Sequence, residues 1–194
     1  MWKEGKFMKK KLAKLIIISL PIFIGFLIYL VFRSKSLFYF NIFRLLGLEP
    51  FILLLREYAS THRELFPTWT VYSLPDGLWL LSFGLSIYFS SRRYFFNLFI
   101  FTSITIFMIY FESFQKEYGG HGTVIGTYDI KDIYCYLGSF FILFLLFIKK
   151  LIFKKKNTEE NSSFLSDILS LIKIIIIFST LAVLPTLLGK SFLL

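Results

Sequence analysis

The chain contains few of the residues on which enzymes usually rely. Its 194 residues include one cysteine, two histidines and 12 acidic side chains. Cys135 has no second thiol with which to form an internal disulfide, and its position within an apolar run is typical of a small core residue. The sequence also lacks a serine nucleophile elbow, a phosphate-binding loop and a dinucleotide-binding fingerprint. We therefore expect no cofactor.

Apolar residues are abundant instead. They make up 56% of the sequence, aromatic residues make up 21%, and the mean hydropathy is +0.70. These values lie far from those of soluble proteins. Crossing a bilayer takes roughly 20 helical residues, and backbone amides in lipid need partners within their own segment. The sequence therefore predicts an all-α integral membrane protein. Residues 1–194 would form one domain, a bundle of about five transmembrane helices near residues 12–32, 75–91, 94–114, 130–148 and 168–188.

The distribution of charge predicts the orientation of this bundle. If the amino terminus is cytoplasmic, the inner segments hold 14 of the 22 basic residues and only four of the 12 acidic residues. The outer segments then carry equal numbers of both signs. Lysine and arginine near membrane spans are retained on the cytoplasmic side, so we expect a cytoplasmic amino terminus and an external carboxyl terminus. Attraction to anionic lipid headgroups accounts for the net charge of +10, and nothing in the pattern indicates binding to nucleic acid.

The segment 37–55 complicates the count of spans, because it is nearly as apolar as the five runs. Asn41, Arg44, Glu49 and Pro50 interrupt it. A sixth span here would move the later lysine clusters to the outside, against the positive-inside bias. We therefore expect residues 37–66 to form short interfacial or re-entrant helices on the outer side. The polar segment 154–163 has no apolar periodicity and is predicted to be a cytoplasmic linker.

Polar side chains converge at the outer mouth of the predicted bundle. Asp76 begins the second span, Glu112 and Gln115 end the third, and Asp129 and Asp132 begin the fourth. Residues three apart share a helix face, and carboxylates at the ends of hydrophobic spans are costly. The last four of these residues are candidates for catalysis, although no reaction is indicated. Candidates for binding a substrate are Asp76, His121, Thr127, Arg56 and Arg63.

Structural explanations compete with these roles. Asp129 and Asp132 lie where a side chain caps the first amides of a helix. Glu112 needs a partner in either case, and the possible cations are Arg56, Arg63, Lys116 and Lys131. His121 together with Glu112, Asp129 and Asp132 suggests a metal site, but their spacing matches no metal signature, so we predict none.

The same stretch resembles a known family. A span that ends in Glu112-x-x-Gln115, a glycine-rich turn, and Gly126-Thr127-Tyr128-Asp129-Ile130-Lys131-Asp132 before a helix are similar to the core of VanZ-like membrane proteins. The likeness covers residues 73–140, including Leu74–Trp79. The chain has Thr127 and Cys135 where many members have arginine and asparagine.

The resemblance implies a role in the cell envelope of bacteria, in the cytoplasmic membrane, with a site that binds or modifies a lipid-linked or cell-wall component. Two other functions remain open. The chain could be a non-catalytic membrane subunit that docks a partner protein, or a small transporter. Transport needs polar residues at the middle of the membrane, and the third and fifth spans supply only a few serines and threonines there.

Overall fold

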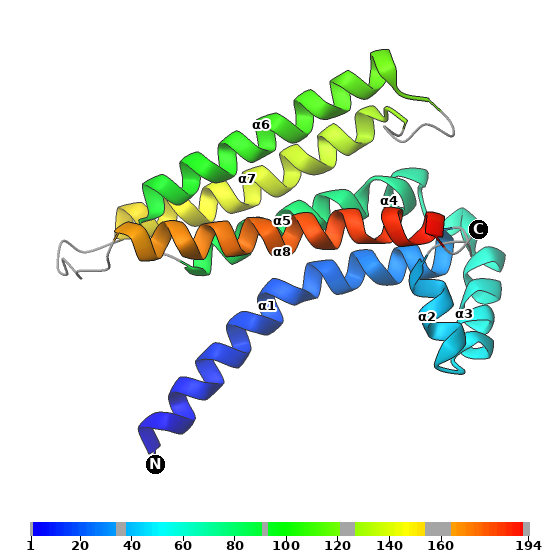
Figure 1. Cartoon of the computed structure of the whole chain (residues 1–194), viewed down its shortest axis with the longest axis horizontal. Coiled ribbons are helices and arrows are strands. Elements are labelled where there is room, and N and C mark those ends of the chain that lie inside the picture. The colour runs from blue at the N-terminus through cyan, green and yellow to red at the C-terminus, as the bar shows by residue number, and fades with distance from the viewer. Residues whose placement is uncertain (1, 34–37, 91–92, 121–126, 154–163, 192–194) are drawn as a thin grey trace.

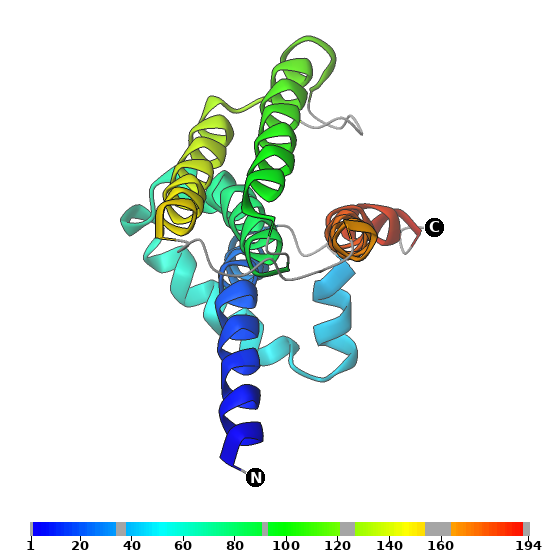
Figure 2. The same cartoon turned by 90° about the vertical axis from the view of Figure 1, so that its left-hand side faces the viewer.

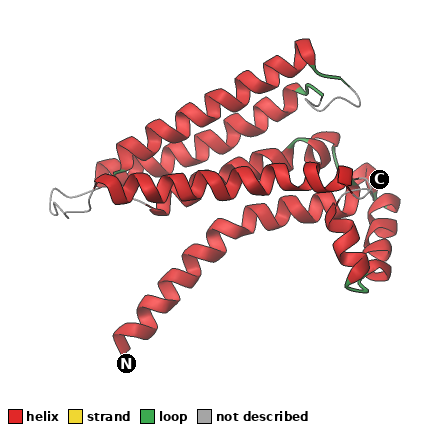
Figure 3. Ribbon diagram, in the orientation of Figure 1, coloured by secondary structure: helices red, strands yellow, loops and turns green. Residues whose placement is uncertain are grey.

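The fold is known from a computed structural model, which describes residues 2–33, 38–90, 93–120, 127–153 and 164–191 (Figure 1). Within these residues every regular element is helical (Figure 3). The long helices are α1 (Trp2–Phe32), α5 (Leu74–Ser90), α6 (Tyr94–Tyr118), α7 (Ile130–Phe153) and α8 (Phe164–Ser191). Between α1 and α5 lie α2 (Phe38–Leu45), α3 (Glu49–Thr61), the 3-10 turn η1 (Arg63–Leu65) and α4 (Thr68–Tyr72). The predicted all-α class is confirmed.

Three helices are long and apolar enough to cross a membrane, judged by length and composition. They are Phe7–Phe32 within α1, all of α6, and Ile130–Ile152 within α7. Helix α5 has 17 residues, and the apolar stretch Ile168–Leu181 in α8 is also shorter. These findings support the predicted class of transmembrane helical protein, whereas the number of five spans stays a prediction.

The long helices alternate in direction. In Figure 1, α1, α6 and α8 run from left to right, and α5 and α7 run back. Consequently α1 and α6 finish where α5 and α7 begin, at the right of the view. We call this the site end of the bundle. The short helices α2, α3 and α4 also lie there, beside the end of α1.

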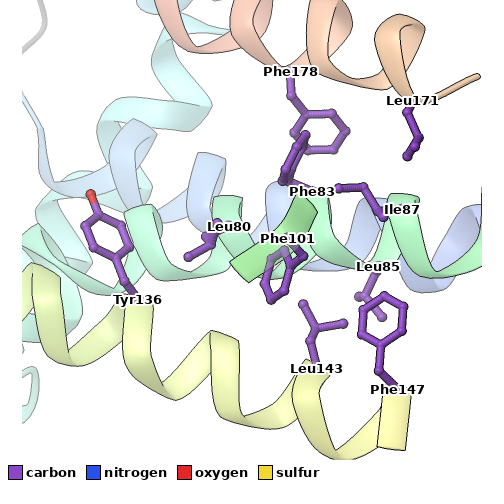
Figure 4. Packing of buried hydrophobic residues seen from close by; sticks show 10 residues of the cluster. All are labelled: Leu80, Phe83, Leu85, Ile87, Phe101, Tyr136, Leu143, Phe147, Leu171 and Phe178. Carbon is purple, nitrogen blue, oxygen red and sulfur yellow. The ribbon is translucent and has the colours of Figure 1, made fainter. Parts of the chain in front are cut away.

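Helix α5 is the centre of the bundle. It contacts α1, α6, α7 and α8, and Figure 2, which looks along the bundle, shows these helices around it. Figure 4 shows the core that results, in which Phe83 of α5 meets Phe178 of α8 with ring centroids 5.1 Å apart. On the opposite side Leu143 and Phe147 of α7 are fully buried.

Small residues let the other helices approach α5 closely. A Cβ added to Gly77 would lie 2.8 Å from Cys135 Cβ of α7, and one added to Gly84 would overlap Leu143 and Phe101. Hydroxyl groups reinforce these contacts. Ser139 Oγ donates to the Gly77 carbonyl at 2.7 Å, and Ser82 Oγ donates to the Ile18 carbonyl of α1. Hydrogen bonds of this kind hold helices together where lipid offers no alternative partner.

The segment predicted as interfacial forms two short helices that pack on the end of α1. Gly47 turns the chain between α2 and α3 with a φ of 69°, a left-handed conformation that favours glycine. Phe40 of α2, Ile52 of α3 and Leu30 of α1 are buried together. The predicted linker 154–163 lies outside the described residues.

Candidate functional site

Three carboxylates of the predicted site meet at the site end. Asp76 lies in the first turn of α5, Glu112 in the last part of α6, and Asp132 in the first turn of α7. The three groups are close enough to interact electrostatically. This convergence follows from the alternating helix directions, because two of these helices begin where the third ends.

Glu112 is 3% exposed and its partner is a backbone amide. The Asp129 N–H donates to Glu112 Oε1 at 2.8 Å. Among the described residues none of the four cations considered from the sequence, Arg56, Arg63, Lys116 and Lys131, forms an ion pair with it. The prediction that one of these cations pairs with Glu112 was therefore wrong. Glu112 joins the end of α6 to the residue before α7, an arrangement that helix spacing alone does not reveal.

Asp129 caps α7. It immediately precedes the helix, and its Oδ1 accepts the Lys131 backbone N–H at 2.9 Å. This is the side-chain bond that an N-cap residue makes to the second residue of a helix. Of the two interpretations of Asp129 considered from the sequence, the structural one has direct geometric support.

Asp76 is held by helix α1. Tyr29 Oη donates to Asp76 Oδ1 at 2.8 Å. One helical turn further, the guanidinium of Arg33 lies 4.9 Å from the ring centroid of Tyr29 and 5.3 Å from that of Tyr72. Arg33 also lies close enough to Asp76 and Asp132 to interact with both. It thus places a positive charge beside two carboxylates of the acidic cluster.

Tyr29 and Arg33 are not among the site residues predicted from the sequence. A tyrosine and an arginine four residues apart share a helix face, and this pair stands at the end of an apolar run. This pattern in the sequence indicates that Tyr29 and Arg33 belong to a polar site. Tyr136 was also missed as part of the site, and it is buried near Asp76, Asp132 and Glu112.

Ser73 completes the cluster. Its side chain is 0% exposed and lies beside the Asp132 carboxylate. Within the described part of the chain, however, neither Ser73 Oγ, Asp132 Oδ1 nor Arg33 Nε has a partner with hydrogen-bond geometry. Buried polar atoms are nearly always paired. A hydroxyl, a carboxylate oxygen and a guanidinium nitrogen therefore retain hydrogen-bonding capacity at one buried place.

The two arginines predicted to bind a substrate have structural contacts. Arg56 donates to the Leu30 and Arg33 carbonyls at 2.7 and 2.6 Å, which satisfies the last turn of α1. Arg63 donates to the Phe66 carbonyl and lies over the Phe32 ring. Both line a pocket of about 480 Å³ between the ends of α1 and α3. Arg56 contacts Arg33 of the acidic cluster through the Arg33 backbone carbonyl.

The remaining candidates are less engaged with the cluster. Gln115 is half-buried near the end of α6, and Thr127 is exposed. His121 lies outside the described residues. Over the described ranges no set of three histidine, cysteine, aspartate or glutamate side chains is arranged to hold a metal ion.

The fold and site define an all-helical protein with transmembrane helices and a buried polar cluster at one end of its bundle. Comparison of the chain with family models, curated proteins and solved structures finds no match. The VanZ-like resemblance stays a prediction.

Proposed function

We propose that the chain is a five-pass protein of a bacterial cytoplasmic membrane whose outer polar cluster binds the polar part of a lipid-linked or cell-wall component. The observation that carries this proposal is the convergence of Arg33, Ser73 and Asp132 at one buried place, where Ser73 lies against the Asp132 carboxylate but Ser73 Oγ, Asp132 Oδ1 and Arg33 Nε have no well-aligned hydrogen-bond partner among the described residues. A cluster that served only to hold helices together would pair its polar atoms, because each unpaired buried group costs about 1–3 kcal/mol.

The helix directions favour five passes over three. Helices α1 and α6 run the same way, so a chain that crosses with both must return between them, and α5 is the helix that runs back. Its 17 residues extend about 26 Å at 1.5 Å per residue, and α4 precedes it directly. Helix α8 runs parallel to α1 and would supply the fifth pass.

The charge distribution favours an outward position for the cluster. Lys14 lies over the Phe89 ring and Lys150 over the Tyr88 ring, in the last turns of α5 and so at the end of the bundle opposite the cluster, where Arg93 immediately precedes α6. Lysine and arginine mark the cytoplasmic side, so the acidic cluster belongs to the external side. Carboxylates, a guanidinium and a hydroxyl together recognise groups with several hydroxyls or amines, such as the sugars and amino acids of cell-wall precursors.

A complementation experiment tests this proposal. The readout follows from the VanZ-like resemblance, because the namesake of that family is known for low-level glycopeptide resistance. The chain is expressed in a bacterial host, and tolerance to a glycopeptide antibiotic is measured for the wild type, Asp132→Asn and Ser73→Ala. The matched control is Asp129→Asn, which removes a carboxylate three residues away but keeps an N-cap side chain. We expect both site variants to insert normally and to lose the tolerance, and the control to keep it. Absence of any effect of the wild-type chain, or full tolerance with Asp132→Asn, overturns the proposal. Stoichiometric co-purification of another protein, with unchanged tolerance, favours the subunit function.

A further inference from the structure

A groove of about 630 Å³ lies between the α4–α5 segment and α7, and its lining includes none of the carboxylates of the acidic cluster. Its walls are mostly apolar. Leu78 and Leu81 line it from α5, and Gly138 and Ile142 line it from α7. Trp69 and Lys131 stand at the site end of the groove. The bottom is closed, because Gly77 packs against Cys135 and accepts the Ser139 hydroxyl.

The length of the groove along α7 matches the thickness of one leaflet of a membrane. From Lys131 to Ile142 the lining follows α7 for roughly 16 Å at 1.5 Å per residue. The hydrocarbon core of a bilayer is about 30 Å thick, so the groove extends from the headgroup level to about the midplane. Gly138 faces open space in this groove, because a Cβ at this position would meet no atom within 4 Å.

Lys131 presents a positive charge at the mouth of the groove. Its Nζ donates to Thr68 Oγ1 at 3.0 Å, and among the described residues it forms no ion pair with a carboxylate. The two neighbouring carboxylates do not neutralise its ammonium group. Asp129 accepts the Lys131 backbone N–H, and Asp132 faces Ser73. The amino end of α7 adds the positive pole of a helix dipole.

We infer that this groove binds one chain of a phosphate-bearing membrane lipid, with its phosphate at Lys131 and Thr68 and its hydrocarbon chain along Gly138. A cation and a hydroxyl at the mouth of an apolar groove of one-leaflet depth complement an anionic headgroup and a single chain. The inference rests on the proposed function in one respect, the placing of the mouth of the groove on the external side of the membrane. It adds to that function the class of lipid that lies beside the polar cluster.

Native mass spectrometry of the detergent-purified chain tests the inference, with phosphatidylglycerol as the probe and diacylglycerol with the same chains as the uncharged comparison. The wild type should bind phosphatidylglycerol. Gly138→Phe, which fills the groove, should reduce binding at least tenfold, and Leu137→Phe, an exposed neighbour outside the groove, should not.

Lys131→Ala should weaken binding of phosphatidylglycerol severalfold without affecting diacylglycerol, and Lys116→Ala should have no effect. Unchanged binding in Gly138→Phe overturns the groove, and equal binding of both lipids by the wild type overturns the role of the phosphate.

A second measurement uses the wild-type chain and does not depend on how any variant folds. Cys135 lines the groove and is the single cysteine of the sequence, so alkylation by N-ethylmaleimide reports on it alone. Phosphatidylglycerol should slow this reaction severalfold, and an unchanged rate contradicts the inference. A dimer mass with the thiol protected in the absence of lipid would assign the groove to a second copy instead. Asp132→Asn separates the two proposals, because it should retain the lipid even though the antibiotic tolerance is lost.

Discussion

The Glu112 carboxylate and the Asp129 backbone amide are joined by a 2.8 Å hydrogen bond that ties the end of α6 to the start of α7. Glu112→Ala leaves this amide without its acceptor in a partly buried place. We expect the free energy of unfolding to fall by about 1–3 kcal/mol. Glu112→Gln keeps an oxygen acceptor and should cost less. Unfolding in mixed micelles, followed by circular dichroism, measures both.

The control for Glu112 is Glu117→Ala, which removes an exposed acid from the same helix. A loss of stability as large as that of Glu112→Ala would show that the negative charge of α6, and not the bond to Asp129, is responsible.

Asp129 should behave as a helix cap. Asp129→Ala removes the acceptor for the Lys131 amide and should cost about 1 kcal/mol, within a range of 0.5–2 kcal/mol. Asp129→Ser and Asp129→Asn keep a capping oxygen and should retain most of the stability. If the serine variant is as unstable as the alanine variant, the charge of Asp129 matters more than its capping bond.

Two glycines, Gly77 on the α5–α7 contact and Gly138 beside it, should respond in opposite ways to alanine. A Cβ on Gly77 would lie 2.8 Å from Cys135 Cβ and 2.9 Å from the Cys135 carbonyl oxygen, so the helices must separate. Gly77→Ala should destabilise the protein by about 1–3 kcal/mol. Gly138→Ala meets open space and should be neutral or stabilise by up to about 1 kcal/mol, because alanine favours a helix more than glycine does.

Thermal unfolding of the two alanine variants in the same detergent makes the comparison direct. Equal effects at the two positions would contradict the close packing of α5 on α7.

Cysteine labelling tests the number of spans. In a Cys135→Ser background, Thr127→Cys at the site end should react with a membrane-impermeant maleimide in intact cells. Lys9→Cys and Arg93→Cys, at the opposite end, should react only after the membrane is permeabilised. Arg93 is the decisive position, because it follows α5 directly: external labelling there means that α5 does not cross.

Part of the site was predictable because helix ends are visible in the sequence. Asp76, Glu112 and Asp132 each stand at the edge of an apolar run, and alternating directions bring such edges together. The bond from Glu112 to the Asp129 amide was not predictable, because it depends on how the chain turns between α6 and α7. Tyr29, Arg33 and Ser73 were missed for a related reason: nothing in the order of the spans says that α1 lies beside α5 at the cluster.

Arg56 has a structural role that was not predicted from the sequence, because its guanidinium donates hydrogen bonds to backbone carbonyls at the end of α1. An arginine near a predicted site indicates a ligand for an anion, and only the neighbouring carbonyls of Leu30 and Arg33 reveal that the same group closes the end of α1. Residues that bind a ligand and residues that cap a helix are of the same types, so spacing alone does not distinguish them.

The central position of α5 has a consequence for the making of the protein. Of its neighbours, α1 and α4 are synthesised before it, whereas α6, α7 and α8 follow later in the chain. When α5 is synthesised, the residues of α6 and α7 that Gly77 and Gly84 face are therefore still absent. A nascent chain that stops after α6 lacks α7, which supplies Cys135 opposite Gly77 and Leu143 opposite Gly84, and membrane proteases should degrade it faster than one that stops after α7.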